Sequence, residues 1–273
     1  MGASKAYGDA AVVLRLEGAV MWRRALSISL GLVSFLAQVP GATGATATLV
    51  HAPARARATR RGVAYSTNWS GYADYHATFT DVEGSWTQPA VTCPSTGRRY
   101  AAFWVGLDGY TSNSVEQIGT DSDCAGQNRP VYYAWYEMYP AASVTLSSSD
   151  PVRAGDSMSA RVSVSGTTFT LVLKNTTRGW TFTTTQTSTS AQDASAEWVA
   201  EAPSSCFITC SVLPLANFGT MHFTGAFVNH RSGTIASYTH DKVIMATSSG
   251  TTKALPSALT GFGTSFGDTW DHS

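Results

Sequence analysis

The sequence predicts an all-β protein, a single antiparallel β-sandwich of two packed sheets. Three observations favour this fold. From Gly62 onward no convincing helical period occurs, short runs of alternating apolar and polar residues recur, and Gly, Ser, Asn and Asp turns separate them. No internal repeat and no Pro- or Gly-rich linker interrupts this region, so a propeller and a pair of domains are both disfavoured.

The positions of the strands are predicted from the alternation of apolar and polar residues. Thr and Ser at many positions, as in 181–190, suit the solvated faces of a sheet in an extracellular protein. Strands are expected at Trp69–Tyr75, Ala77–Trp86, Tyr100–Leu107, Ser114–Thr120, Val131–Tyr139, Ser143–Leu146, Ser157–Ser165, Thr168–Leu173, Trp180–Thr187, Ala194–Val199, Thr220–Val228, Thr234–Thr239 and Lys242–Thr247.

The most aromatic of these strands is 131–140, Val-Tyr-Tyr-Ala-Trp-Tyr-Glu-Met-Tyr-Pro. Alternation places Tyr133, Trp135, Glu137 and Tyr139 on one face. An ionised carboxylate among aromatic rings is costly unless it is paired. The strand is therefore either an ordinary core strand or the floor of an aromatic groove that holds an acid.

The N-terminal region has the pattern of a secretory signal. Residues 21–24 (Met-Trp-Arg-Arg), an apolar run at 25–39 and small residues up to Ala47 match its three parts, and the run is too short to span a membrane. We expect a signal peptide at 1–47, with Met21 as an alternative start, and a secreted, extracellular protein. Residues 48–61 are basic and aperiodic, which predicts a pro-segment or linker without a fold, removed to give an N-terminus between Thr59 and Ser66. The domain is then 62–273.

The charge and the cysteine content of the sequence exclude some classes of function. From residue 62 onward there are ten basic and sixteen acidic residues and no basic stripe, which argues against nucleic acid as a partner. No His or Cys lies at zinc-finger spacing. The four cysteines allow three pairings in a secreted chain. The short spacing of Cys206 and Cys210 favours a small loop, which leaves Cys93 with Cys124.

Familiar nucleophile motifs are missing from the sequence. There is no Gly-x-Ser-x-Gly elbow, paired cysteines leave no thiol, and the histidines are scattered. Polar residues inside apolar strands are more informative. Asp108 ends one strand, Glu116 and Gln117 point to opposite faces of the next, and Glu197 lies beside Trp198. Burial of such an acid raises its pKa and suits it to proton transfer in acid, although edge strands also carry Glu for solubility.

Taken together, five segments resemble, in order, the eqolisins, the secreted glutamic endopeptidases. They are 68–71 (Asn-Trp-Ser-Gly), 103–109 (Phe-Trp-Val-Gly-Leu-Asp-Gly), 116–119 (Glu-Gln-Ile-Gly), 134–140 (Ala-Trp-Tyr-Glu-Met-Tyr-Pro) and 196–199 (Ala-Glu-Trp-Val). The resemblance runs from about Asn68 to Val228. It implies a bent sandwich of concanavalin-like or jelly-roll type with a substrate cleft on its concave face.

The resemblance also implies the site. The catalytic dyad of the family falls on Gln117 and Glu197, and no metal or cofactor is required. Glu197 would act as general base toward a water, and Gln117 would position that water and stabilise the oxyanion. Polypeptides are the implied substrates, and we expect a monomer with no membrane contact after processing. The implied cleft residues are Trp104, Asp108, Asp121, Trp135, Glu137 and Tyr139; where the family commonly has an acid, this chain has Tyr133.

Two other functions compete with this one. A glycoside hydrolase on a similar sandwich would use Glu197 with a second carboxylate such as Glu137, although the sequence lacks the closely spaced acidic strand motif of many such enzymes. A carbohydrate-binding module would stack sugars on aromatic residues such as Trp135 and Tyr139 without turning them over.

Overall fold

The structure, a computed structural model, describes residues 47–60 and 62–273, so the expected signal peptide lies outside the described residues except for Ala47. The described residues all belong to one compact unit. Their two helices are the short 3-10 turns Ile235–Ser237 and Gly261–Gly263, and none is long and apolar enough to cross a membrane.

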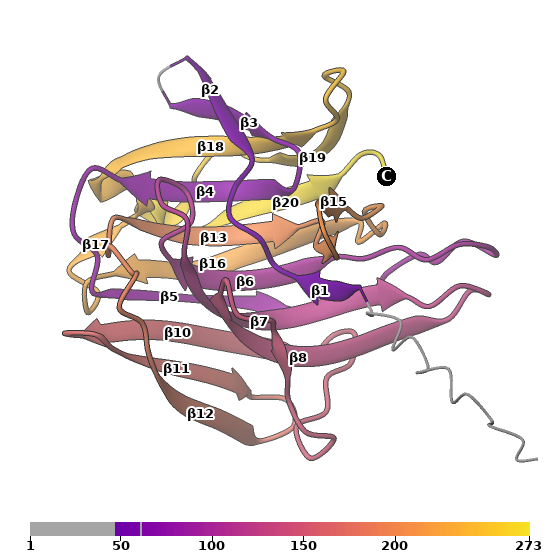
Figure 1. The fold of residues 1–273 in the computed structure, drawn as a ribbon, viewed down its shortest axis with the longest axis horizontal. Coiled ribbons are helices and arrows are strands. Elements are labelled where there is room, and N and C mark those ends of the chain that lie inside the picture. Colours follow the sequence, from indigo (N-terminus) through magenta and orange to yellow (C-terminus); the bar gives the residue numbers. More distant parts are fainter. Residues whose placement is uncertain (1–46, 61) are drawn as a thin grey trace, which may run out of the picture. The chain divides into compact units, whose positions relative to one another are not determined.

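Strands make up nearly all of the regular structure (Figure 1). In chain order they are β1 (Thr48–Val50), β2 (Ala56–Arg60), β3 (Val63–Ser66), β4 (Trp69–Tyr75), β5 (Asp81–Thr87), β6 (Ala102–Leu107), β7 (Val115–Cys124), β8 (Pro130–Tyr139), β9 (Val144–Thr145), β10 (Ser157–Ser165), β11 (Thr168–Asn175), β12 (Trp180–Thr187), β13 (Ser195–Glu201), β14 (Ser204–Cys206), β15 (Cys210–Val212), β16 (Thr220–Val228), β17 (Gly233–Thr234), β18 (Thr239–Ala246), β19 (Thr252–Pro256) and β20 (Phe266–Trp270).

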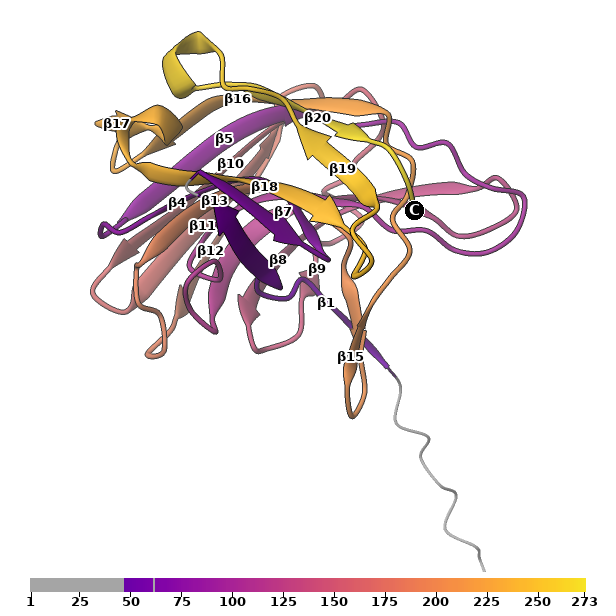
Figure 2. The same ribbon diagram turned by 90° about the horizontal axis from the view of Figure 1, so that it is seen from above.

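The strand pairings give two layers. The first has the order β9-β8-β7-β6-β13-β4-β18-β3-β2, in which only β18 and β3 are parallel. The second has the order β12-β11-β10-β5-β16-β20-β19. Strand β18 pairs with β4 and, from Met245 onward, with β19, so it belongs to both layers. Figure 2 shows the two layers from above. The predicted antiparallel β-sandwich is confirmed.

Apolar side chains from both layers form the core between them. Trp198, Phe103 and Ile118 from the first layer are fully buried together with Phe223 and Leu171 from the second. The opposite face of the first layer, which we call the site face, carries a smaller apolar cluster around Trp69, Trp104 and Trp135. Central strands of the first layer are therefore covered on both faces, which explains why β6, β7 and β13 are buried at every residue.

Alternation located most strands but not all of their ends. Strands β4, β10, β12 and β16 have the predicted bounds, whereas β13 continues to Glu201 and β7 continues to Cys124. The predicted strand 234–239 is instead the end of β17 followed by a 3-10 turn. The strands without a prediction are short or lie near the ends of the domain: β1, β2, β3, β14, β15, β19 and β20.

Residues 48–61 are the main correction to the sequence analysis. They were predicted to have no fold, but β1 pairs with β14 and β2 pairs with β3. The strands form because edges of the folded domain supply hydrogen-bond partners, and local sequence pattern contributes little. Order therefore begins at the start of this segment, well before Asn68.

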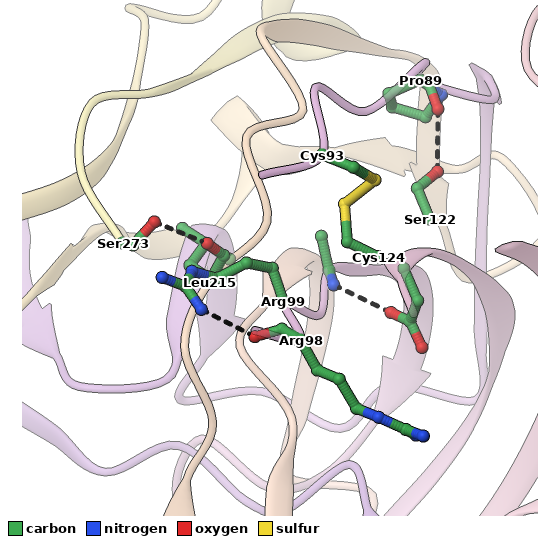
Figure 3. The surroundings of a disulfide bond; sticks show 10 residues. Pro89, Cys93, Arg98, Arg99, Ser122, Cys124, Leu215 and Ser273 are labelled. Atoms are coloured by element: carbon green, nitrogen blue, oxygen red, sulfur yellow. Dashed lines mark hydrogen bonds between the residues drawn. A yellow bond between two sulfur atoms is a disulfide. The ribbon is translucent and has the colours of Figure 1, made fainter. Parts of the chain in front are cut away.

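The two disulfides join the expected cysteines. Cys93 and Cys124 are 31 residues apart in sequence, and their bond links the loop after β5 to the end of β7. Figure 3 shows its surroundings, where Ser122 donates a hydrogen bond to the carbonyl of Pro89 beside the bridge. Cys206 and Cys210 close a hairpin of four residues' separation between β14 and β15, with Phe207 and Ile208 exposed at its tip.

Removing the first bridge should cost far more stability than removing the second. Loop-closure entropy predicts a loss of about 3–4 kcal/mol for the Cys93→Ser/Cys124→Ser pair and about 2 kcal/mol or less for Cys206→Ser/Cys210→Ser. The measurement is the urea midpoint of each double variant against the parent. Equal losses of stability for both pairs would contradict the prediction that the Cys93–Cys124 bridge is the more stabilising disulfide.

Candidate functional site

Strand register places the expected dyad in one row across the first layer. Glu137 on β8 pairs with Gln117 on β7, Gln117 pairs with Gly106 on β6, and Gly106 pairs with Glu197 on β13. Directly paired residues project from the same face of a sheet. Beyond Glu197 the row continues through Ala73 on β4 to β18. We call this line the site row.

Gly106 lies between Gln117 and Glu197 in the site row and leaves space between their side chains. Neighbouring strands lie about 4.8 Å apart, so Gln117 and Glu197 leave the sheet about 10 Å apart with one strand between them. A Cβ at position 106 would lie 3.1 Å from the Cβ of Gln117 and 3.0 Å from the ring of Trp104. The absence of a side chain there leaves space between the amide of Gln117 and the carboxyl of Glu197.

A second row of large aromatic residues borders the site row. Trp135 on β8 pairs with Gly119 on β7, which pairs with Trp104 on β6. A Cβ on Gly119 would lie 2.3 Å from the carbonyl oxygen of Phe103, so only glycine fits beneath the two indoles. Trp104 also meets Trp69 edge to face at 4.8 Å between ring centroids.

Buried carboxyls hold the indoles of Trp135 and Trp104 in place through hydrogen bonds. Trp135 donates its Nε1–H to Asp121 at 2.6 Å, and Trp104 donates its Nε1–H to Glu201 at 2.9 Å. The hydroxyl of Tyr133 lies 2.7 Å from Asp121 and 3.0 Å from Asp123. Tyr133, which departs from the family pattern, thus places a hydrogen-bond donor between two acids.

The N-terminal segment, residues 48–57, lies on this site. The ring of His51 stacks on Trp135 with 3.5 Å between centroids and 2° between planes. Its backbone N–H donates to Glu137 at 2.8 Å, its Nδ1 lies 3.1 Å from the same carboxylate oxygen, and its Nε2 lies 3.4 Å from Asp121. His51 is completely buried. Burial lowers the pKa of His51, but the carboxylates of Asp121 and Glu137 outweigh it and raise that pKa to about 10.

The backbone of His51 reaches the expected dyad. Gln117 donates its Nε2–H to the carbonyl oxygen of His51 at 2.6 Å and lies 3.4 Å from the carboxylate of Glu137. Glu137, the acid of the aromatic strand, is therefore a fully buried acid paired with the N-terminal segment.

Beyond His51 the segment crosses toward β4 (Figure 1). The carbonyl of Ala52 accepts hydrogen bonds from Asn68 at 3.1 Å and from Trp69 at 2.9 Å, and Ala54 donates to the carbonyl of Gly109 at 3.1 Å. Since its contacts extend from β8 and β7 to β4, the segment passes over the intervening strands, which include β13 with Glu197.

Glu197 is a buried acid with little direct hydrogen bonding. Neither of its oxygens has a hydrogen bond of normal geometry within the described residues. Burial raises the pKa of Glu197 well above its usual value; nearby Ser195 and the Tyr110 N–H oppose this rise, and the charges of Asp108 and Asp74 add to it. Burial therefore favours the neutral form of this carboxyl.

The remaining expected residues have different surroundings. The carboxylate of Asp108 accepts three backbone N–H bonds from residues 192–194, so it holds the loop that leads into β13. Tyr139 is partly buried against the aromatic cluster of the site face. Glu116 lies on the opposite face from Gln117 and accepts a hydrogen bond from Ser188 at 2.9 Å.

Sequence reasoning missed three groups that complete the site. Glu201 could have been found by alternation from Glu197, had the predicted strand not ended at Val199. The role of Asn68 and Trp69 in holding the N-terminal segment has no signal in their own strand pattern. His51 is a lone histidine in an aperiodic basic stretch, and such a residue gives no period, spacing or motif that predicts its contacts.

Comparisons with known proteins agree on one family. A sequence profile described as the Peptidase A4 family matches residues 67–263. The chain is 29% identical over 198 residues to Aspergillopepsin-2 of Aspergillus niger, covering 63% of this chain and 67% of that protein. Scytalido-glutamic peptidase, solved with a transition state analog inhibitor, superposes with a TM-score of 0.66 at 24% identity, over 75% of this chain and 98% of that chain. Aspergilloglutamic peptidase from Aspergillus niger gives a TM-score of 0.52 at 25% identity, over 63% and 99%.

Removing the hydroxyl of Tyr133 should destabilise the fold. In Tyr133→Phe two buried acids lose a donor, which predicts a loss of about 1–3 kcal/mol in the free energy of unfolding. Tyr132→Phe is the matched control, because Tyr132 points to the other face and has no hydrogen-bond partner for its hydroxyl within the described residues. Urea unfolding measures both, and equal effects would refute the bridging role of Tyr133.

Stability should fall as pH rises from about 4 to about 8, the reverse of ordinary acid denaturation. Burial raises the pKa of Asp74 to about 9 and that of Glu116, Asp123, Glu201 and Asp268 to about 8. In the unfolded chain these groups titrate near 4, so between the two values the folded state binds more protons and loses stability with pH.

Urea midpoints measured across this pH range test the sign of that dependence. Asp74 has no hydrogen-bond partner for either carboxyl oxygen within the described residues. Asp74→Asn should therefore flatten the slope by about 1.4 kcal/mol per pH unit, the value for one titrating group. Exposed Asp271→Asn is the control and should leave the slope unchanged. A midpoint that rises from pH 4 to 8 would contradict the prediction.

Proposed function

The chain belongs to the peptidase A4 family and is a glutamic endopeptidase, and we propose that it cleaves proteins in acid, outside the cell, with Gln117 and Glu197 as its dyad. The observation that carries the dyad is a contact to a peptide group. Gln117 donates its amide N–H to the carbonyl of His51 at 2.6 Å, while Glu197 lies in the same row across Gly106. Peptide hydrolysis requires an amide donor for the carbonyl oxygen and a carboxyl that moves the proton of a water, and Gln117 and Glu197 offer these two groups from one row.

Each residue of the dyad has a distinct task in the proposed reaction. In its ionised form, which burial disfavours, Glu197 removes a proton from a water molecule in the space over Gly106, and that water attacks the carbonyl carbon of the substrate. Gln117 donates to the carbonyl oxygen as negative charge develops on it, an interaction that contributes about 3–4 kcal/mol in comparable oxyanion sites. Protonated Glu197 then gives its proton to the departing amine. No covalent intermediate forms.

The neighbouring acids support binding of a cationic or aromatic side chain next to the cleaved bond. Trp135 offers an indole face, and Glu137 and Asp121 lie at its edge. A positive ring or guanidinium would stack on the indole and pair with these carboxylates. We therefore assign Trp135, Glu137 and Asp121 to one substrate subsite, with Trp104 and Tyr139 as its apolar surroundings and Asp108 as a support for the loop before β13.

The number of buried carboxyls supports the proposed action in acid. The neutral form of each is favoured by burial, so a medium that protonates them stabilises the folded enzyme. Two disulfides and the signal-like N-terminus support secretion. We propose a monomer that acts on polypeptides without a membrane or nucleic-acid partner.

The row geometry disfavours the alternative of a glycoside hydrolase. Glu197 and Glu137 are three strand spacings apart, about 14 Å between backbones. Their side chains leave the same face side by side. The carboxyl pairs of retaining and inverting glycosidases lie about 5–5.5 Å and 6.5–9.5 Å apart.

Three substitutions test the dyad. Glu197→Gln keeps the shape but removes the proton acceptor, so peptidase activity should disappear. Gln117→Ala should lower kcat at least about a hundredfold with a smaller effect on KM, as expected for a lost transition-state donor. Glu116→Gln, on the other face of β7, is the control and should stay within a few-fold of the parent.

The measurements are kcat and KM on one acid-denatured protein substrate, with circular dichroism to show that each variant is folded. A folded Glu197→Gln enzyme at the parental rate would refute the dyad. So would an inactive Glu116→Gln enzyme beside an active Gln117→Ala enzyme.

A further inference from the structure

We propose that a pocket around Lys253 and Arg99 is a binding site for a small tetrahedral oxyanion of the sulfate or phosphate class. The pocket has a volume of about 500 Å³ and contains no residue of the site row. It lies where several separate parts of the chain meet. Thr67 comes from the loop before β4, Arg99 from the loop before β6, Ser248 from the turn after β18, Lys253 from β19 and Ser273 from the end of the chain.

Lys253 is a buried cation without a counter-ion. The residue is 6% exposed, and within the described part of the chain its Nζ donates only one long hydrogen bond, 3.4 Å to the carbonyl oxygen of Thr67. None of the ion pairs between described residues includes it. Burial lowers the pKa of Lys253 to about 8, so its ammonium group is charged in acid. A buried charge that is left unpaired destabilises the folded state.

Arg99 supplies a second positive charge to the same pocket. Its Nη1 donates to the backbone carbonyl of Arg98 at 2.8 Å, and its guanidinium has no carboxylate partner among the described residues. Figure 3 shows Arg99 and Ser273 near the first disulfide. Ser273 donates its hydroxyl to the carbonyl of Leu215 at 3.0 Å, and the carboxylate at this end of the described chain forms no ion pair with either cation.

The groups that line the pocket are those that bind an oxyanion. No Asp or Glu side chain is among them, and the hydroxyls of Thr67 and Ser248 make no hydrogen bond to another described residue. Ammonium and guanidinium groups form strong, charge-assisted hydrogen bonds to the oxygens of sulfate and phosphate. Sulfate keeps two negative charges in acid, whereas phosphate carries one, so sulfate is the better match for the two cations.

A bound oxyanion would connect parts of the fold that strand pairing leaves separate. It would contact β19 through Lys253, the loop before β6 through Arg99 and the turn after β18 through Ser248. These parts lie far apart in sequence and meet in the folded protein. An ion that binds the folded state alone raises the free energy of unfolding. The ion would therefore stabilise the protein in acid, where Lys253 is charged.

The experiment is thermal unfolding of the purified protein in acid, with chloride replaced stepwise by sulfate at constant ionic strength. The melting temperature of the parent should rise by at least about 3 °C between zero and about 20 mM sulfate. Lys253→Met keeps an apolar stem and removes the charge, so it should show no rise. Arg99→Gln should need at least about tenfold more sulfate for the same rise. Isothermal titration calorimetry should find one sulfate bound per parent chain.

Arg98→Gln is the matched control, because Arg98 is exposed next to Arg99 in the sequence and does not line the pocket. It should respond to sulfate as the parent does. Equal losses of response in Arg98→Gln and Arg99→Gln would indicate a general effect of charge and would overturn the site. A parent that does not respond to sulfate would also overturn it, as would a Lys253→Met variant that still responds or an equal response of the parent to acetate.

Discussion

The site depends on one constraint, the register between β8, β7, β6 and β13. This register aligns Glu137, Gln117, Gly106 and Glu197, and a slip of one residue in any pair would send one of them into the core. The core itself prevents such a slip. Residues that alternate with the site row, such as Ile118 and Trp198, fill the space between the two layers and would be driven to the opposite face. The geometry of the proposed dyad is thus fixed by the same packing that makes the sandwich stable.

A second feature of the structure is its many buried carboxyl groups. Carboxyls that accept hydrogen bonds from indoles and hydroxyls, such as Asp121 and Glu201, orient the aromatic floor. Others have no such partner, and Asp74 lies in the core with both oxygens unpaired within the described residues. A protein that works at neutral pH would lose stability by burying such groups. In acid they are neutral, so a fold with this composition is suited to an acidic medium, which supports the proposed action in acid.

Much of the architecture could be predicted from the sequence because alternation is a local property. Trp135 and Glu137 were placed on one face by period alone, and Glu116 and Gln117 on opposite faces. The family resemblance, rather than the period, pointed to Glu197. What could not be predicted depends on contacts between distant parts of the chain. The strands β1 and β2 exist because folded edges accept them, and His51 reaches Trp135 across 84 residues of sequence through a segment with no pattern of its own.

Strand β18 has a consequence for when the enzyme first becomes active during its biosynthesis. It covers the free edge of β4, and β4 is the neighbour of β13, which carries Glu197. A ribosome must therefore complete most of the chain before these central strands can assemble in their final order, because the pairings join residues far apart in sequence. Until then Gln117 and Glu197, the proposed dyad, are not held in one row. The order of synthesis thus postpones peptidase activity until the late strands are in place.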